Sequence, residues 1–591
     1  MLDARIYRAA LVPVLLAVIV CAFSLQDQPQ PITTTLAPDA FSGGRVEREL
    51  ADLARAFPAR RAGDAVDSAL GRRLAEDLRA VRPAYEVSSP SFEGETIEGE
   101  RTLTTVLARQ VGAPGPELVV VAHRDAAGRD ARAELSGTAV MLELARVVSG
   151  GRLRRTVTFV STSGGSGGAA GARDVARRLG GNPIDAVLVL GDLGSARLRR
   201  PVGASWSDGS ELGPLVLRRT VADAVRQEAA TGAGDPGVVT QWTRLAFPGT
   251  LGEQGPLVAA GLPAVLMSAS GERPPAAGAR VSGERLEAFG RAALRALLAL
   301  DEGRAVRAAP TRDVVTLRKV LPAWAVRLLI GALLVAPLLV TVDGFARARR
   351  RREPVGAWLG WIGAAAAPFA LAAALVTVMG LTGLLVATPR APVPPGAIAI
   401  DGAARAALIA TGLALVLGVV ARPAVLRLLH GRRRLAGVGA GVALMLAWCL
   451  LAAGLWVFNP FAAAFMVPAA HLWLLLAAPG VRMRRGVALL LVAVSLAPFA
   501  IGALVLSGQL GLGPLDLGWA ALLWVAGAHV GPVSWLFWSV AAGCALAAIV
   551  LAWRTRPAPR TPEGEPRITV RGPLTYAGPG SLGGTESALR R

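Results

Sequence analysis

Two kinds of apolar pattern divide the chain, and the change falls near residue 320. Before it, helices are predicted for residues 45–57, 64–81, 136–149 and 169–179, and short continuous apolar runs occupy residues 118–122, 156–160 and 186–190. Such short runs are typical of strands that are buried on both faces. This part of the chain therefore predicts an α/β fold, with a central, mostly parallel or mixed sheet between helices.

After residue 320 the apolar runs become long enough to cross a lipid bilayer, which takes about 20 helical residues. An earlier run, residues 9–25, follows two arginines and lacks an Ala-x-Ala motif after it, which favours an uncleaved anchor over a signal peptide. A shorter run at 516–530 is predicted to be re-entrant or interfacial. The other predicted spans are 321–342, 356–380, 402–421, 436–457, 461–479, 486–507 and 533–553.

Arginine clusters between the spans predict their orientation. Basic loops stay on the cytoplasmic side of a membrane. We therefore expect eight spans, with residues 27–320 outside the cell membrane and the N-terminus and basic tail in the cytoplasm. A ninth span at 516–530 would place the tail outside. The clusters follow the second, fourth and sixth spans and comprise Arg347, Arg349, Arg350, Arg351 and Arg352, then Arg422, Arg427, Arg432, Arg433 and Arg434, then Arg482, Arg484 and Arg485.

Composition supports this division. The chain has 591 residues, is 53% hydrophobic and has a mean hydropathy of +0.47, which excludes a single soluble domain and excludes disorder. Most of its net charge of +21 lies between apolar runs, so no nucleic-acid partner is predicted. The predicted segments are a transmembrane anchor (1–26), a linker (27–44), an exterior α/β domain (45–310), a membrane domain with seven or eight further spans (321–553) and a disordered basic tail (554–591).

Few exterior residues have side chains suited to catalysis or metal binding. All three cysteines lie in apolar runs, so the exterior half has neither a disulfide nor a thiolate metal site. Its single histidine, His123, follows the apolar run 118–122 and precedes Asp125 by two positions. Loops at the carboxyl ends of parallel strands often form binding sites, and a His-x-Asp pair can reach one metal ion. Taken alone, the same pair fits a surface histidine beside an ion pair.

Several segments in order resemble the zinc exopeptidase family that includes aminopeptidase Y and glutamate carboxypeptidase. The resemblance covers roughly residues 45–300 and implies an α/β fold with two zinc ions at the strand ends. The segment Ser136–Arg146 is its most specific part. The matching segments are Ala56–Arg60, Glu117–Asp125, Leu135–Arg146, Arg155–Val160, Gly191–Gly194 and Gly255–Val265.

The resemblance also implies that the site is degenerate. His123, Asp125 and Asp192 match a zinc ligand, its companion aspartate and a later ligand. The bridging aspartate of the family corresponds to Ala133, next to Glu134. The glutamates that provide the general base and a ligand correspond to Gly164 and Gly165, in the Ser/Gly-rich stretch 161–168. The last ligand histidine corresponds to Gln254.

Physical chemistry explains why these changes matter. A bridging carboxylate offsets the repulsion of two close dications, and a metal-bound water needs a base. Neither alanine nor glycine provides such a group. We therefore expect no catalytic metal. The alternative is a single zinc ion bound by His123, Asp125 and Asp192, together with Glu134.

Other catalytic readings of the exterior half are weaker. A serine hydrolase would have to use His123 as its base with Ser161, Ser163 or Ser166, but no Gly-x-Ser-x-Gly elbow follows a strand in the expected form. The stretch 161–168 lacks the Lys of a phosphate-binding Walker loop. In the membrane, His471 and His529 have no acidic partner within a span, which favours a structural role over ion transport.

The sequence therefore predicts a degenerate, zinc-peptidase-like protein anchored in the lipid bilayer. Its exterior cleft would bind a peptide, a glycan or a partner protein. One alternative is an active aminopeptidase-type metallopeptidase with a remodelled one-metal site. Another is a transporter or lipid-handling bundle for which the exterior domain is a lid. Fold resemblance alone does not establish an activity.

Overall fold

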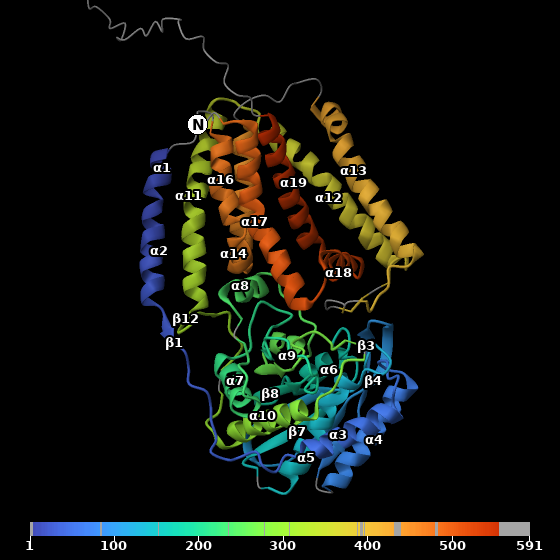
Figure 1. Cartoon of the computed structure of the whole chain (residues 1–591). Helices are drawn as coiled ribbons and strands as arrows, with labels where there is room; N and C mark the ends of the chain where they lie inside the picture. Colours follow the sequence, from blue (N-terminus) through green and yellow to red (C-terminus); the bar gives the residue numbers. More distant parts are fainter. Residues whose placement is uncertain are drawn as a thin grey trace, which may run out of the picture.

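The computed structural model describes most of the chain. The described residues are 4–82, 85–151, 153–234, 236–276, 278–306, 308–386, 388–389, 394, 396–430, 439–478 and 483–554. The predicted basic tail after residue 554, Arg432, Arg433, Arg434 and Arg482 lie outside the described residues. An α/β domain sits at one end of a long helical bundle, and the N-terminal helix and the end of the last helix lie at the opposite end (Figure 1).

A seven-stranded mixed sheet forms the centre of the α/β domain, as the apolar runs predicted. The four central strands are parallel, and antiparallel strands flank them at both edges. In the pairing of the neighbouring strands β6 and β7, His123 at the end of β6 lies opposite Thr162 at the end of β7. In spatial order the strands are β2 (Glu86–Ser88), β5 (Val106–Gln110), β7 (Arg155–Thr162), β6 (Ala113–His123), β8 (Ile184–Leu190), β10 (Ala264–Met267) and β9 (Gly203–Ala204).

Two smaller sheets complete the β structure. A hairpin of β3 (Ser91–Thr96) and β4 (Gly99–Thr104) projects beside the main sheet. The second sheet joins the two membrane connections, because β1 (Gln26–Asp27) pairs with β12 (Lys319–Leu321), which in turn pairs with β11 (Val314–Val315). The chain therefore enters and leaves the α/β domain at the same place.

Helices cover both faces of the central sheet. In β6, Leu118, Val120 and Ala122 pack on one face and Val119 and Val121 on the other, which explains the continuous apolar run. The first face carries α3 (Gly43–Ala56), α4 (Ala65–Val81), α5 (Ser136–Ser149), α7 (Leu215–Ala229) and α10 (Gly283–Glu302); the second carries α6 (Ala170–Leu179), α8 (Val238–Ala246) and α9 (Gln254–Ala259).

Eight helical segments among the described residues are long and apolar enough to cross a membrane. They are Arg5–Phe23, Ala323–Arg350, Val355–Leu381, Gly402–Leu428, Gly439–Phe458, Pro460–Ala477, Arg485–Leu510 and Pro532–Arg554. The elements are α1 (Ala4–Ala9), α2 (Leu11–Phe23), α11 (Ala323–Arg350), α12 (Val355–Leu381), α13 (Gly402–His430), α14 (Gly439–Phe458), α15 (Pro460–Ala464), α16 (Val467–Ala477), α17 (Arg485–Leu510) and α19 (Pro532–Arg554).

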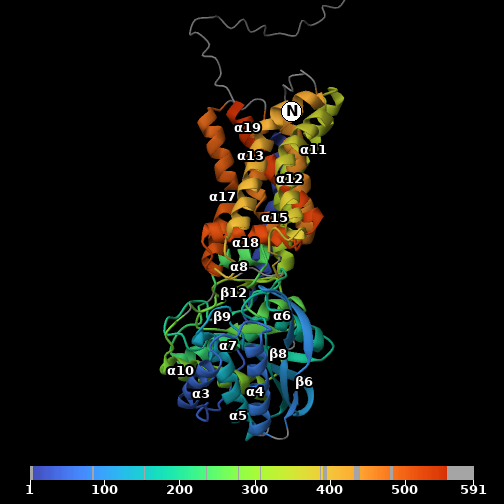
Figure 2. The same ribbon diagram turned by 90° about the vertical axis from the view of Figure 1, so that its right-hand side faces the viewer.

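The short apolar run becomes α18 (Pro514–Ala526), which is too short to span a membrane. It lies across the long helices at the end of the bundle nearest the α/β domain (Figures 1 and 2). The described arginines of the loop 351–352 and the start of α17 lie at the opposite end, beside the N-terminus.

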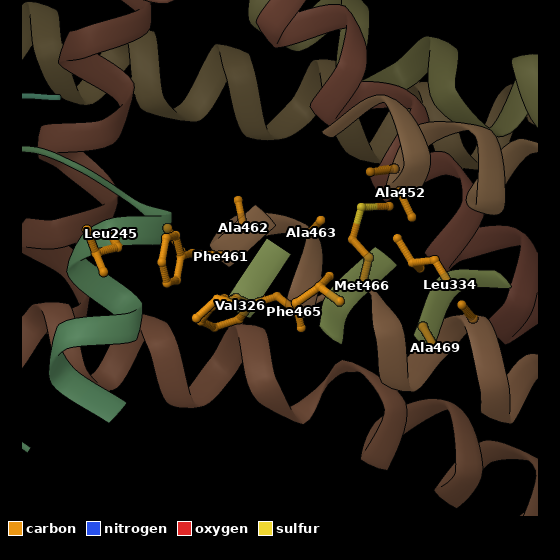
Figure 3. Close-up of a cluster of buried hydrophobic side chains, with 14 of the residues drawn as sticks. Leu245, Val326, Leu334, Ala452, Phe461, Ala462, Ala463, Phe465, Met466 and Ala469 are labelled. Carbon is orange, nitrogen blue, oxygen red and sulfur yellow. The ribbon is translucent and has the colours of Figure 1, made fainter. Parts of the chain in front are cut away.

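The α/β domain docks on the bundle through α8. Figure 3 shows Leu245 of α8 beside Phe461 of α15, at one end of a row of buried apolar side chains that continues into the bundle. The Trp242 indole N–H donates to the Phe461 carbonyl at 3.1 Å, and the two rings meet edge to face. The Asn459 amide donates to the Leu245 carbonyl at 2.9 Å and to Ser210 Oγ at 3.0 Å. Apolar packing and these polar contacts thus join the two parts.

Replacing Asn459 tests this docking. Asn459→Ala removes the donor that satisfies the carbonyls at the end of α8, and leaving buried acceptors unpaired costs about 1–3 kcal/mol. We expect faster hydrogen exchange along Val238–Ala246 in the purified full chain, measured by mass spectrometry. Asn182→Ala, at an exposed turn, is the control and should leave this exchange unchanged. Equal protection of α8 in both variants would contradict the role of Asn459.

Candidate functional site

The candidate site lies where the parallel strands of the main sheet end. His123 ends β6, the stretch 163–168 follows β7, and Asp192 follows β8 by two residues. These carboxyl ends meet at one edge of the sheet, as expected for an open α/β fold. The edge faces the bundle, because Arg273, which lines the pocket there, donates to the Gly508 carbonyl of α17 at 2.6 Å. The site therefore lies between the sheet and the membrane helices.

His123 is mostly buried and lies beside a glutamate. Its side chain is 17% exposed, and Nδ1 is 3.8 Å from Glu253 Oε2. The Thr162 hydroxyl donates to the other oxygen of Glu253, whereas Oε2 has no hydrogen-bond partner among the described residues. Burial raises the pKa of the Glu253 carboxyl, and the nearby His123 opposes that rise.

Asp125 anchors the loop that follows β7. Its carboxylate accepts from the backbone N–H groups of Gly165 at 2.9 Å and Ser166 at 3.0 Å, and from the Ser166 hydroxyl. Its charge is therefore satisfied by donors of the chain itself. Asp125 thus orders the Ser/Gly-rich loop beside His123.

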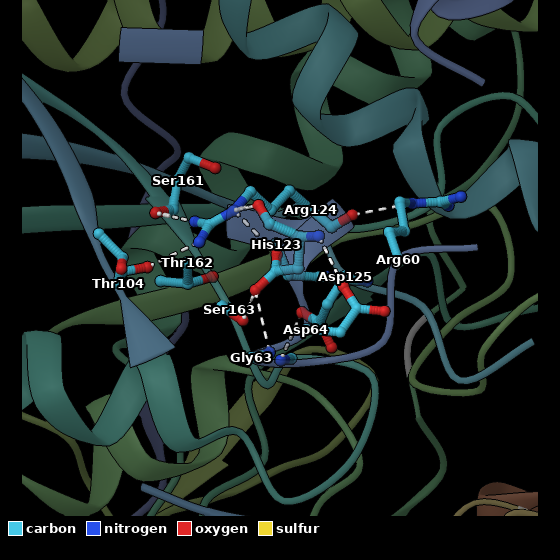
Figure 4. A network of polar contacts seen from close by, with 12 residues as sticks. Arg60, Gly63, Asp64, Thr104, His123, Arg124, Asp125, Ser161, Thr162 and Ser163 are labelled. Carbon is cyan, nitrogen blue, oxygen red and sulfur yellow. Dashed lines mark hydrogen bonds and ion pairs between the residues drawn. The ribbon is translucent and has the colours of Figure 1, made fainter. Parts of the chain in front are cut away.

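A buried ionic network supports this arrangement from behind (Figure 4). Arg124 and Asp67 are both fully buried and form an ion pair at 2.9 Å. Arg124 also donates to the carbonyls of Ser161 and Thr104, and Arg60 donates to the Arg124 carbonyl at 2.8 Å. A buried charge that keeps such partners is tolerated, whereas removing one partner is strongly destabilising. The network holds the end of β6 in place.

Gly164 and Gly165 are required by the local geometry. Gly164 has a φ of +82°, a conformation that favours glycine. A Cβ at Gly165 would lie 2.4 Å from the His123 Cβ, far closer than real Cβ atoms approach. The space that a side chain at position 165 would need is occupied by His123 itself.

Asp192 is also fully hydrogen-bonded. One oxygen accepts from the backbone N–H groups of Gly194 and Ser195, both at 2.9 Å, and from Ser136 Oγ at 3.3 Å. The other oxygen accepts from the Ser270 hydroxyl. The carboxylate caps its own turn and ties β8 to the loop after β10.

Glu134 is the second carboxyl group with an unpaired oxygen. It lies with Ala133 in the 3₁₀ turn Arg132–Leu135 and is 6% exposed, and Oε2 has no partner among the described residues. Burial raises the pKa of Glu134 from 4.5 to about 7, although His123 and Arg60 favour its ionised form. Glu134 is therefore poised to gain or lose a proton near neutral pH.

Gln254 does not face His123. Its amide donates to Glu272 at 2.8 Å, and Glu272 in turn pairs with the buried Arg244. Its neighbour Glu253, which we did not single out from the sequence, is the residue beside His123. The sequence could not show which of the two adjacent residues, Glu253 or Gln254, points into the site, because this depends on how the first turn of α9 is oriented.

These polar side chains lie on one side of a small cavity of about 50 Å³, and valine, leucine and proline side chains form much of the rest of its wall. We call it the polar cavity after its carboxyl and imidazole groups. Its walls include His123, Glu134, Asp192 and Glu253 from the sheet edge. Arg273 and Pro394, the latter from the connection between α12 and α13, complete the side that faces the bundle. The volume is well below the roughly 300–1,000 Å³ of typical small-molecule pockets. It suits a few waters or one small charged group.

The donors present do not fit a pair of zinc ions. Ala133 and both glycines offer no ligand atom, while Asp125 and Asp192 already accept several hydrogen bonds each. Within the described part of the chain, no group of three or more His, Cys, Asp or Glu side chains is arranged to hold a metal ion. No two-metal hydrolysis step can therefore be derived from this geometry.

Two of the three candidate serines and both candidate histidines of the bundle have hydrogen-bond partners away from His123. The Ser163 and Ser166 hydroxyls donate to Asp67 and Asp125 rather than to His123. In the bundle, His471 contacts the Tyr7 hydroxyl at 2.7 Å and the Leu333 carbonyl at 2.9 Å, and His529 contacts the Thr388 carbonyl. Both histidines thus have backbone carbonyl partners, which agrees with the structural role favoured from the sequence.

Comparisons with known proteins concern the architecture. No protein-family model and no curated protein sequence matches the chain. Similar solved structures include Porphyromonas gingivalis glutaminyl cyclase (17% identity, TM-score 0.34, 44% of this chain and 98% of that chain) and the zinc aminopeptidase BSAP of Bacillus subtilis (12%, 0.36, 45% and 97%). The Legionella pneumophila LapA aminopeptidase is another (14%, 0.37, 46% and 76%). At such low identity, nothing about activity follows from these similarities.

Placing a carboxylate at position 165 should destabilise the loop beside His123. Gly165→Glu pushes a Cβ into His123, and such overpacking costs about 1–3 kcal/mol. We expect a lower melting temperature and no gain in zinc binding, measured on the purified chain by thermal unfolding and elemental mass spectrometry. Gly181→Glu, where a Cβ meets open space, is the control and should unfold like the wild type. A Gly165→Glu variant that is as stable as the wild type and binds zinc would contradict this steric conflict.

Glu134 should make stability depend on pH. Because its pKa is higher in the folded chain, folding takes up a proton, and stability is lost as pH rises from about 4.5 through 7. The loss amounts to about 3 kcal/mol, at roughly 1.4 kcal/mol per pH unit. Glu134→Gln should therefore raise the melting temperature at pH 8 and have little effect at pH 5. The exposed control Glu76→Gln should show no such pH dependence, and a parallel profile for both variants would refute the assignment.

Proposed function

We propose that this chain is a membrane-embedded, zinc-peptidase-like protein whose α/β domain binds the cationic group of a ligand and does not hydrolyse peptides with two zinc ions. The observation that carries the proposal is a pair of buried carboxyl groups, Glu134 and Glu253, each with one oxygen that has no hydrogen-bond partner among the described residues. Leaving a buried acceptor unpaired costs about 1–3 kcal/mol, more when it is charged. A protonated amine is a small group that would satisfy both.

The amino terminus of a peptide is the ligand that fits this chemistry best. An ammonium carries three N–H donors, enough to reach Glu134, Glu253 and a further acceptor of the cavity. The cavity of about 50 Å³ leaves room for that head group but not for a whole peptide, so the rest of the ligand would extend past Arg273 and Pro394. Binding would favour ionised Glu134 and would therefore strengthen between pH 6 and pH 8.

The orientation of the chain supports a ligand outside the cytoplasm. The described arginines at the end of α11 and the start of α17 lie at the end of the bundle away from the α/β domain. By the distribution of basic residues, the α/β domain is then exterior and both ends of the chain are cytoplasmic. The ligand would be met at the outer surface of the membrane.

A matched pair of probes tests the proposal. Alanine amide carries a free amine, whereas N-acetyl-alanine amide carries none. In the purified full chain we expect alanine amide alone to raise the melting temperature, because a ligand that binds only the folded state stabilises it. Glu253→Gln should weaken this binding at least tenfold, and the exposed control Glu76→Gln should not. Equal responses to both probes would refute the binding of a cationic group.

A peptidase assay on the same protein distinguishes the remodelled one-metal enzyme. Glu253 lies beside His123 with an unpaired oxygen, which is the observation that favours a single zinc ion there. We expect no release of p-nitroaniline from alanine p-nitroanilide with or without added zinc. Zinc-dependent release that is lost in His123→Ala would replace the binding proposal by a one-metal aminopeptidase.

A further inference from the structure

A second cavity lies between the α/β domain and the bundle. It is bounded by the segment Phe247–Gly249 after α8, by one face of α17 and by α18, and its volume is about 330 Å³. Every side chain that lines it is apolar, including Phe499 and Leu506 of α17 and Trp524 of α18. The volume falls at the lower end of the roughly 300–1,000 Å³ found for ligand pockets. We call this cavity the apolar cleft.

The apolar cleft adjoins surfaces that face lipid. On α17, Ile501 and Leu504 are 51% and 65% exposed, and on α18 Leu515 is 88% exposed. Ala503 and Ala521, which line the cleft, are themselves exposed, so the cleft is open at this surface. Since α17 is among the helices long and apolar enough to span a membrane, hydrocarbon chains are the medium in contact with this opening. A water molecule in such a space is poorly stabilised, because it finds few polar groups with which to form hydrogen bonds.

The cleft and the polar cavity share a wall. Phe247, Pro248 and Gly249 line the apolar cleft, and Leu251, Gly252 and Glu253 of the same segment line the polar cavity. Leu251 packs against Leu510, Leu512 and Ala520 of the cleft side. A molecule in the cleft would therefore lie next to the segment that positions Glu253.

We propose that the apolar cleft binds one acyl chain of a membrane phospholipid, taken from the leaflet on the side of the α/β domain. A peptide segment is a poor occupant, because its backbone N–H and C=O groups would remain unpaired against apolar walls. A phospholipid chain has no such groups along its length.

Photochemical labelling locates the chain directly. The full-length protein is placed in nanodiscs of phosphatidylcholine that contain a small fraction of the same lipid with a diazirine on one acyl chain. After irradiation, labelled residues are mapped by mass spectrometry. We expect label on Phe247–Gly249 and on the cleft faces of α17 and α18. Label confined to the outward faces of α13 and α17, as for lipid that merely surrounds the bundle, would overturn the proposal.

Two exposed alanines of α17 provide a matched pair of variants. Ala503→Trp fills the cleft and should lower the label on Phe247–Gly249 at least fivefold, whereas Ala493→Trp, outside the cleft, should leave it unchanged. Ala521→Trp closes the cleft from α18 and must reproduce the loss, which covers the case in which Ala503→Trp does not fold. Equal labelling of Phe247–Gly249 in all three variants would refute an acyl chain in the cleft. The readout is the position of the label, so it does not depend on whether the polar cavity binds an amine.

Discussion

The contact between α8 and the membrane helices is the constraint on which the site depends. Trp242 and Leu245 of α8 pack against the apolar core of the bundle and join it to one face of the α/β domain. The Asn459 side-chain amide donates hydrogen bonds to backbone carbonyls at the end of α8. Because α8 lies on the same sheet face as α9, this docking also sets where Glu253 stands. The carboxyl edge of the sheet is thereby turned toward the helical bundle.

Within that edge, the carboxylates of Asp125 and Asp192 are held by hydrogen bonds from the chain itself. The carboxylate oxygens of Asp125 and Asp192 accept hydrogen bonds from backbone N–H groups and serine hydroxyls, so each residue closes a turn. Gly165 lets the loop approach His123 so closely that no side chain fits between them. The consequence is a rigid, folded loop rather than an empty ligand position. Among the described carboxyl groups that line the polar cavity, only Glu134 and Glu253 have an oxygen without a hydrogen-bond partner, and burial raises the pKa of both.

The sequence allowed the repeating elements to be predicted, because their patterns depend on local burial. The runs at 118–122, 156–160 and 186–190 are apolar on both faces and became β6, β7 and β8, and the long runs became the eight long apolar helices. The strands β2 to β5 were missed, because residues 86–110 mix polar and apolar positions. Of these strands, β2 and β5 lie at one side of the main sheet, and β3 and β4 form a separate hairpin. Neither the docking through α8 nor the choice of Glu253 over Gln254 could be predicted, since each depends on surfaces far apart in the chain.

The segment Phe247–Glu253 links the two cavities mechanically. Its first half lines the apolar cleft with α17 and α18, and Phe247 meets Phe465, which follows α15, with ring centroids 5.1 Å apart. Its second half presents Glu253 to His123. Packed interfaces do not deform continuously, so a shift of α17 against the α/β domain must be taken up by this segment or by the Arg273 contacts beside it. The distance between Glu253 and His123 is therefore set partly by the membrane helices. In this molecule the contacts of Arg273 with α17, together with Pro394 in the cavity wall, make the helical part of the chain a part of the site.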